Sequence, residues 1–279
     1  MRVIRSILAS AWMGWQREMK WTNPALSLFV KAVAPTAAVL SAAAVYWFGS
    51  SFIGLFTPER LAYIIVGASM YSQVAAYTYV PTAAITEGKW SNLYPQVYIT
   101  PTSSIPYLAG RCLASFADSV PVIVISLAVS YYVSYALFGS PPSITISLTS
   151  VFMIGGALVL SIPAATALGY LLGSYSIFVS RFEWALPSYV SGLLMIFSEA
   201  LFPANILPYP LSLIAEIVPF TYLMRASRAA LIYNSWSMYL NSMQYLALGG
   251  MVFLLMGLVA FRKAENSARV KGYIDKKVM

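Results

Sequence analysis

The chain has 279 residues, of which 59% are hydrophobic and only 9% are charged, and its formal net charge is +8. Soluble domains carry about 25% charged residues, so this composition excludes an ordinary soluble domain and indicates a membrane protein. Histidine is absent and Cys112 is the only cysteine, which excludes an intrachain disulfide, a thiolate metal cluster and Ser–His or Cys–His catalysis.

The first 22 residues predict an amphipathic helix that lies in the membrane interface. Arg2, Arg5, Arg17 and Lys20 lie off its apolar face, as in helices that bind at a lipid headgroup layer. A surface helix of a soluble domain is the alternative, but the composition provides no such domain. The apolar face is made of Ile4, Ile7, Leu8, Ala11, Trp12, Trp15 and Met19.

Six segments are apolar and long enough to cross a bilayer, which takes about 20 residues. Lys31 lies near the start of the first and is expected to reach back to the headgroups. Gly169 and Gly173 in the fourth predict close helix approach. A basic tail, 262–279, follows the last segment. The predicted spans are 25–48, 61–85, 105–138, 144–173, 184–202 and 242–261.

Residues 203–235 are apolar but are interrupted by prolines, among them Pro203 and Pro219. The pieces between the prolines are too short to cross a membrane. We expect two short helices that dip partway into the bilayer and are covered by protein or face water.

An even number of spans places both termini on one side of the membrane. Most basic residues then lie on that side, and only Arg60, Arg225 and Arg228 lie on the other. The positive-inside rule therefore predicts cytoplasmic termini, in the plasma membrane, and a hairpin at 203–235 that faces outside. Because the bases gather at the termini and in short loops, nucleic-acid binding is not expected.

The segment 87–104 then lies in the cytoplasm. Glu87, Trp90 and Tyr94 recur at helical spacing, and Tyr98 follows four residues later. One acid and three aromatic side chains on one face would anchor the segment in a groove of another protein. The alternative is that these aromatic residues sit in the headgroup belt of the membrane.

Polar groups inside the predicted spans are costly in lipid and need partners. We expect Asp118 to pair with Arg111, two turns away, or with a base on another helix, and substrate contact is the alternative. Tyr71, Gln73 and Ser191 either line a transport pathway or form hydrogen bonds between helices.

Charged residues also gather in and before the predicted hairpin. Glu199 ends the fifth predicted span, and Glu216, Arg225 and Arg228 follow within the hairpin. We expect salt bridges among them to lock the hairpin, and an outer gate is the alternative role.

The order of these features resembles the ABC-2-type permeases, the membrane subunits of ATP-binding-cassette exporters. The resemblance covers nearly the whole chain. It depends on the stretch with Glu87, Trp90, Thr100 and Pro101, and on the hairpin. Residues 92–95, Asn-Leu-Tyr-Pro, differ from the Gly-Thr-Leu-Glu of many relatives. The hairpin residues that match are Pro203, Pro208, Pro219, Phe220, Thr221, Tyr222 and Arg228.

The resemblance implies two permease subunits, as a homodimer, and two copies of a separate ATPase, which carries the ATP and Mg²⁺. No G-x-x-x-x-G-K-[ST] motif occurs in this chain, so it is not expected to be an enzyme. The substrate would be amphipathic, lipid-like or drug-like. The resemblance assigns ATPase coupling to Glu87, Lys89, Trp90, Tyr94, Tyr98, Thr100 and Pro101.

Other functions remain alternatives. A secondary transporter would show repeats with broken spans at the midplane, and no such repeat is evident in the sequence. A membrane scaffold subunit is compatible with the sequence. An intramembrane enzyme lacks paired catalytic carboxylates.

Overall fold

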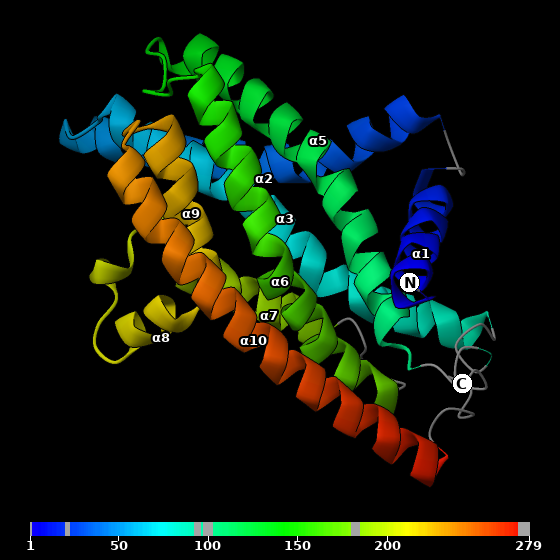
Figure 1. The fold of residues 1–279 in the computed structure, drawn as a ribbon. Helices are drawn as coiled ribbons and strands as arrows, with labels where there is room; N and C mark the ends of the chain where they lie inside the picture. Colours follow the sequence, from blue (N-terminus) through cyan, green and yellow to red (C-terminus); the bar gives the residue numbers. More distant parts are fainter. Residues whose placement is uncertain (1, 20–22, 92–95, 97–102, 180–184, 273–279) are drawn as a thin grey trace.

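The computed structural model describes residues 2–19, 23–91, 96, 103–179 and 185–272. All regular elements among these residues are helices (Figure 1). They are α1 (Arg2–Met19), α2 (Pro24–Ile53), α3 (Pro58–Trp90), α5 (Ile105–Phe138), α6 (Leu148–Phe178), α7 (Ala185–Phe197), the 3-10 turn η1 (Ala204–Ile206), α8 (Leu211–Ile217), α9 (Pro219–Leu231) and α10 (Trp236–Lys271).

Four of the described helices are long and apolar enough to cross a membrane: α2, α5, α6 and α10. Local sequence signals explain where they begin. The Asn23 side chain accepts a hydrogen bond from the Ala25 amide before α2, and Ser147 does the same for Ser150 before α6. The third predicted span, 105–138, has the bounds of α5. The chain is therefore an α-helical protein with several membrane-embedded helices.

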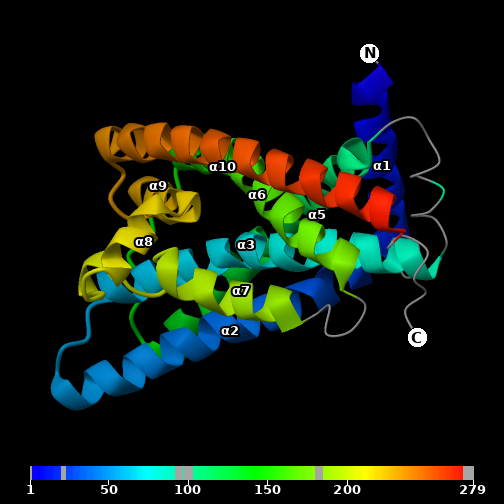
Figure 2. The ribbon, with the colours of Figure 1, turned by 90° about the horizontal axis from the view of Figure 1, so that it is seen from below.

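The second predicted span lies in α3, which is long enough to cross but has no stretch apolar enough to be counted with those four helices. Figure 2 shows α3 in the middle of the molecule, with α2 and α7 on one side and α6, α9 and α10 on the other. Its side chains at Ser69, Gln73 and Thr78 are fully buried. Polar groups are tolerated at this depth because neighbouring helices, rather than lipid, surround them.

The fifth predicted span, 184–202, differs in the structure. Its helix, α7, ends at Phe197 and has 13 residues, about 20 Å of helix. That is shorter than a hydrocarbon core of about 30 Å, so the described part of this segment does not make a complete span. The chain turns just after it, where Glu199 has a φ of 57°.

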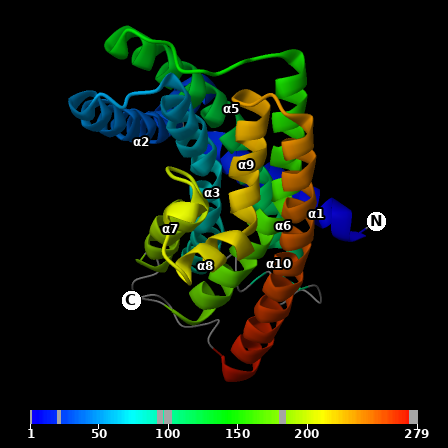
Figure 3. The same cartoon turned by 90° about the vertical axis from the view of Figure 1, so that its left-hand side faces the viewer.

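The predicted hairpin consists of short helices, as the prolines indicate. α8 ends at Ile217, and Pro219 begins α9. Pro219 packs beside Gly249, about 20 Å along α10 from its start, whereas the Leu231 carbonyl accepts a hydrogen bond from Thr145 N, just before α6. α9 thus runs from the middle of the bundle to one end, beside α10 (Figure 3).

α7 and α9 meet near the middle of the molecule, because Thr221 Oγ1 donates a hydrogen bond of 3.0 Å to the Phe197 carbonyl. We call the end of the bundle where α9 stops, next to the starts of α6 and α10, the hairpin end. The opposite end holds the last turns of α3, α6 and α10 and the first turns of α5. We call it the charged end, after Arg17, Glu87, Lys89, Arg111 and Glu265.

α10 extends ten residues beyond the predicted sixth span, 242–261, so the first part of the predicted basic tail is helical. It ends at Lys271, followed by Gly272 with a φ of 65°, a left-handed helix cap. The sequence after Phe261 is rich in Ala, Glu, Lys and Arg, which favour helix. Residues 273–279 lie outside the described residues.

α1 lies against the start of α5, where Gly110 lets the two backbones approach closely. A Cβ at Gly110 would come within 2.5 Å of the Ile7 carbonyl oxygen. Part of the predicted apolar face of α1 points away from the bundle, since Leu8 and Trp12 are 60% and 58% exposed, whereas Met19 at its end is buried. This open apolar face, with basic residues off it, fits a helix that lies in the membrane interface.

Gly169 and Gly173 lie at a close helix contact, as predicted. A Cβ at Gly169 would lie 2.8 Å from Pro81 Cγ and 2.9 Å from Cys112 Sγ, which belong to α3 and α5. Gly155 on the same helix has no atom within 4 Å of its Cβ position.

We expect Gly169→Leu to lower the free energy of unfolding by at least about 2 kcal/mol, because the added side chain has no space between three helices. The matched control is Gly155→Leu, whose side chain extends into open space. Thermal unfolding of the purified variants in detergent measures both. Equal unfolding temperatures for the two variants would contradict the helix contact.

Candidate functional site

Glu87, predicted to be a docking residue, is held by two arginines at the charged end. Its Oε2 lies 3.1 Å from Arg17 Nη1 and 3.6 Å from Arg111 Nη2. The first arginine belongs to α1 and the second to α5. The Glu87 side chain is 40% exposed. It therefore links three helices and is still accessible to a partner.

Lys89 binds the end of α6 instead of extending freely. Its Nζ donates hydrogen bonds to the carbonyls of Ser176 at 2.7 Å and Ile177 at 3.2 Å. The last carbonyls of a helix have no partner within the helix, and they carry the negative end of its dipole. The ammonium group of Lys89 gives these carbonyls a donor and places a positive charge at the negative end of the dipole. It thereby joins α3 to α6.

Glu265 belongs to this cluster, although the sequence had not indicated it. The carboxylate is buried and accepts hydrogen bonds from Ser104 N at 3.1 Å and Ser103 Oγ at 2.8 Å. Arg269, one turn later, lies 3.0 Å from the same carboxylate. A negative charge at the start of α5 is favourable. The spacing of Glu265 and Arg269 was a signal for helix, but only the structure shows the contact with α5.

The remaining predicted coupling residues, Tyr94, Tyr98, Thr100 and Pro101, lie outside the described residues, as does the side chain of Trp90. The backbone of Trp90 ends α3. Docking of an ATPase through these side chains stays a prediction.

Asp118 pairs with Lys31, and not with Arg111. Lys31 Nζ lies 2.8 Å from Asp118 Oδ2, between α2 and α5. The expectation that Lys31 reaches back to the headgroups is corrected, because its ammonium compensates a carboxylate that is 7% exposed. The partner comes from another helix, which is one of the two arrangements that the sequence left open.

The polar residues suspected of lining a pathway have partners on neighbouring helices. Tyr71 Oη donates to the Ser191 carbonyl and lies 3.0 Å from Ser191 Oγ, between α3 and α7. Gln73 Nε2 lies 3.4 Å from Ser161 Oγ on α6. These contacts are the hydrogen bonds between helices that the sequence offered as the alternative.

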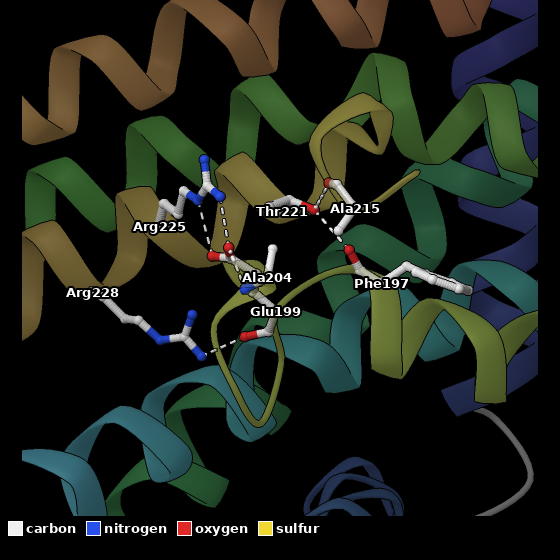
Figure 4. Close-up of polar contacts among 7 residues, drawn as sticks. All are labelled: Phe197, Glu199, Ala204, Ala215, Thr221, Arg225 and Arg228. Carbon is white, nitrogen blue, oxygen red and sulfur yellow. Dashed lines mark hydrogen bonds and ion pairs between the residues drawn. The ribbon is translucent and has the colours of Figure 1, made fainter. Parts of the chain in front are cut away.

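The hairpin end holds the predicted salt bridge (Figure 4). Arg225 donates from Nε to Glu199 Oε2 at 2.9 Å and from Nη2 to Glu199 Oε1 at 2.6 Å. Both carboxylate oxygens are thus used in a paired geometry, which is the strong form of this contact. Glu199 Oε1 also accepts a hydrogen bond of 2.9 Å from Ala204 N. The hydrogen bonds that Arg225 donates to Glu199 raise the pKa of Arg225.

Arg228 holds the same loop through backbone carbonyls rather than through a carboxylate. Its Nη2 donates to the Glu199 carbonyl at 2.5 Å (Figure 4). The same atom donates to the Ala200 carbonyl at 3.0 Å. The guanidinium carbon lies 3.4 Å from the centre of the Tyr63 ring, a cation–π contact. Burial lowers the pKa of Arg228 to about 10, so the group stays charged at neutral pH.

Two arginines on one face of α9 therefore fix the turn after α7, one through a carboxylate and one through carbonyls. We call these contacts of Arg225 and Arg228 with the turn after α7 the clasp. Gly67 on α3 makes room for it, since a Cβ there would collide with the Ala200 carbonyl oxygen and with Arg228 Nη2. The salt bridge between Glu199 and Arg225 agrees with the prediction, whereas the link of Arg228 to Tyr63 on α3 was not predicted. Pro203 stands directly before η1 in the clasped loop, and Pro219 begins α9.

No protein-family model matches this chain, and no curated protein matches it. Among the described residues, no group of three or more Cys, Asp or Glu side chains could hold a metal ion. The function is therefore inferred from the helices, the charged end and the hairpin end.

Proposed function

We propose that this chain is the transmembrane subunit of an ATP-binding-cassette exporter of the ABC-2 type. It lies in the plasma membrane with both termini in the cytoplasm. Two copies would form the pathway, and two copies of a separate ATPase, with ATP and Mg²⁺, would drive it. The substrate would be amphipathic, lipid-like or drug-like, and would leave from the cytoplasm or the inner leaflet.

The observation that carries this proposal is the set of connections around the segment between α3 and α5. Glu87 contacts α1 and α5, Lys89 contacts α6, and Glu265 joins the start of α5 to α10. A partner that pushed on this segment would act on five helices together. This is the mechanical link that a permease driven by a separate ATPase needs, because its own residues supply no nucleotide chemistry.

The hairpin end supports the same proposal. α7 and α9 each cover about half the length of the bundle, and two arginines lock the turn between them. A locked hairpin of half-length helices is suited to closing a pathway on the side opposite the ATPase, and closure there would prevent leakage between transport cycles.

The test is the double variant Trp90→Ala with Tyr94→Ala, purified with whatever ATPase accompanies the chain in native membranes. We expect the ATPase to dissociate or to lose its stimulation by the permease, because the aromatic anchors supply much of the binding energy. The variant should still insert into the membrane. Binding and ATP hydrolysis are measured with the purified complex.

A matched control replaces two exposed aromatic residues elsewhere, Trp236 and Tyr132, with alanine, and this variant should keep the ATPase. Unchanged coupling in the Trp90 and Tyr94 variant would reject the docking segment. Transport that continues in purified vesicles with no nucleotide and no ATPase would favour a secondary transporter, and a complex without any transport would favour a scaffold subunit.

A further inference from the structure

A cavity of about 410 Å³ lies at the hairpin end. Residues of α3, α8, α9 and α10 and the loop after α7 line it. The charged side chains of its wall are Glu199, Arg225, Arg228 and Glu216. The salt-bridge network of the hairpin thus faces a space large enough for a small ligand.

In the buried part of the wall, Arg228 has no carboxylate within ion-pair distance among the described residues, because Glu199 pairs with Arg225. Glu199 is fully used by Arg225, which binds both of its carboxylate oxygens. Arg228 is 2% exposed and donates only to neutral carbonyls, and its Nη1 has no hydrogen-bond partner among the described residues. A buried charge without a counter-charge is costly, and an anionic group in the cavity would lower that cost.

The same wall also carries a negative charge, that of Glu216, which does not pair with Arg228. Glu216 of α8 is exposed and forms no ion pair among the described residues. A simple anion would be attracted by Arg228 but repelled by Glu216. A ligand that carries an anionic group toward Arg228 and an ammonium group toward Glu216 would satisfy both charges.

The rest of the surroundings fits a phosphodiester with an apolar attachment. Asn205 and Asn241 in the wall provide amide donors for phosphate and glycerol oxygens. Ile206 and Ile217, which follow the wall residues Asn205 and Glu216 in the chain, are each 67% exposed. These apolar side chains offer a surface along which acyl chains could lie.

We propose that this cavity binds a zwitterionic headgroup in which a phosphodiester is joined to a primary amine. The phosphate faces Arg228 and the ammonium faces Glu216. The site goes beyond the export function, because binding here requires neither ATP nor a partner. The headgroup could belong to a membrane lipid or to a free glycerophosphoamine, and the experiment distinguishes these two sources.

The experiment measures the midpoint of thermal unfolding of the purified chain in an uncharged detergent. The soluble probes are sn-glycero-3-phosphoethanolamine and glycerol 3-phosphate, which lacks the amine. We expect both probes to raise the midpoint in a saturable way. The zwitterion should reach half of its maximal effect at a lower concentration than glycerol 3-phosphate. Because Arg228 also holds the loop and its removal would disturb folding, the test variants are at Asn241 and Glu216.

Asn241→Asp places a negative charge beside the bound phosphate. It should raise the probe concentration needed for half-saturation by at least about tenfold. Asn266→Asp, the same change at an exposed position of the charged end, should leave binding unchanged. Glu216→Gln should remove the preference for the zwitterion over glycerol 3-phosphate. These three results together assign the two ends of the headgroup.

The lipid arm repeats the measurement in nanodiscs of phosphatidylglycerol with and without phosphatidylethanolamine. A shift with the lipid but not with the soluble probe shows that acyl chains contribute. A shift with the soluble probe alone identifies a free compound as the ligand. No saturable shift with either form, or an equal shift in Asn241→Asp, would overturn the proposal.

Discussion

Replacing Arg228 by methionine is expected to lower the free energy of unfolding by about 3 kcal/mol or more. The guanidinium donates to the carbonyls of Glu199 and Ala200 and stacks on Tyr63. Methionine fills part of the space but leaves these carbonyls without a donor in a buried place. Hydrogen bonds to a charged group contribute about 1.5–3 kcal/mol each, and buried groups left unpaired add to the loss.

The measurement is thermal and denaturant unfolding of the purified chain, with Arg60→Met as the control. Arg60 is exposed in the first turn of α3, so its replacement should change stability by less than about 0.5 kcal/mol. Hydrogen exchange should also rise at residues 198–206, since their contact with α9 is lost. If Arg228→Met unfolds at the same temperature as the unmodified chain, the clasp does not hold the hairpin.

The second large effect is expected at the charged end, for Glu265→Leu. This change removes the acceptor of Ser104 N and Ser103 Oγ and the carboxylate that Arg269 contacts. We expect a loss of about 2–3 kcal/mol in the free energy of unfolding, because a buried amide at the start of α5 loses its partner and the helix loses a favourable charge.

Hydrogen exchange measures where this loss occurs. Protection should fall at the start of α5 and in the part of α10 beyond Phe261, while the hairpin end stays protected. Asn266→Ala, next in the chain and exposed, is the matched control and should show neither change. A uniform fall in protection across all helices, or no fall at all, would contradict a local anchor at Glu265.

The two ends of the bundle differ in how well the sequence predicted them. At the hairpin end, the prolines predicted where one short helix ends and the next begins, and Pro219 does begin α9. The pairing of Glu199 with Arg225 was also expected. The role of Arg228 was only partly foreseen, because its partners are backbone carbonyls, and the sequence does not reveal which carbonyls lack donors. The cavity beside it was not foreseen.

At the charged end, Glu87 and Lys89 were expected to contact a partner protein, which stays a prediction, and their contacts with neighbouring helices were not foreseen. Helical spacing reports which residues share one face of one helix. It does not report that α1, α5 and α6 come within reach of the last turn of α3. The aromatic residues of the docking segment remain a prediction, because they lie outside the described residues.

The sequence by itself determined the class of protein and most of the helices. Low charge and long apolar runs exclude a soluble domain, and caps and prolines are local signals that act within a few residues. The bounds of α5 and the division of the hairpin at Pro219 were readable for this reason. The length of α7 was not, because the apolar residues Ala200, Leu201 and Phe202 resume after Ser198 and Glu199.

Only the tertiary structure decided which polar groups pair. Asp118 meets Lys31, which is 87 residues away in the chain, and Arg111 meets Glu87 instead. Glu265 reaches back to Ser104 across 161 residues. A buried charge must find a partner, but the identity of that partner depends on how the helices are packed, and packing depends on contacts that are distant in the sequence.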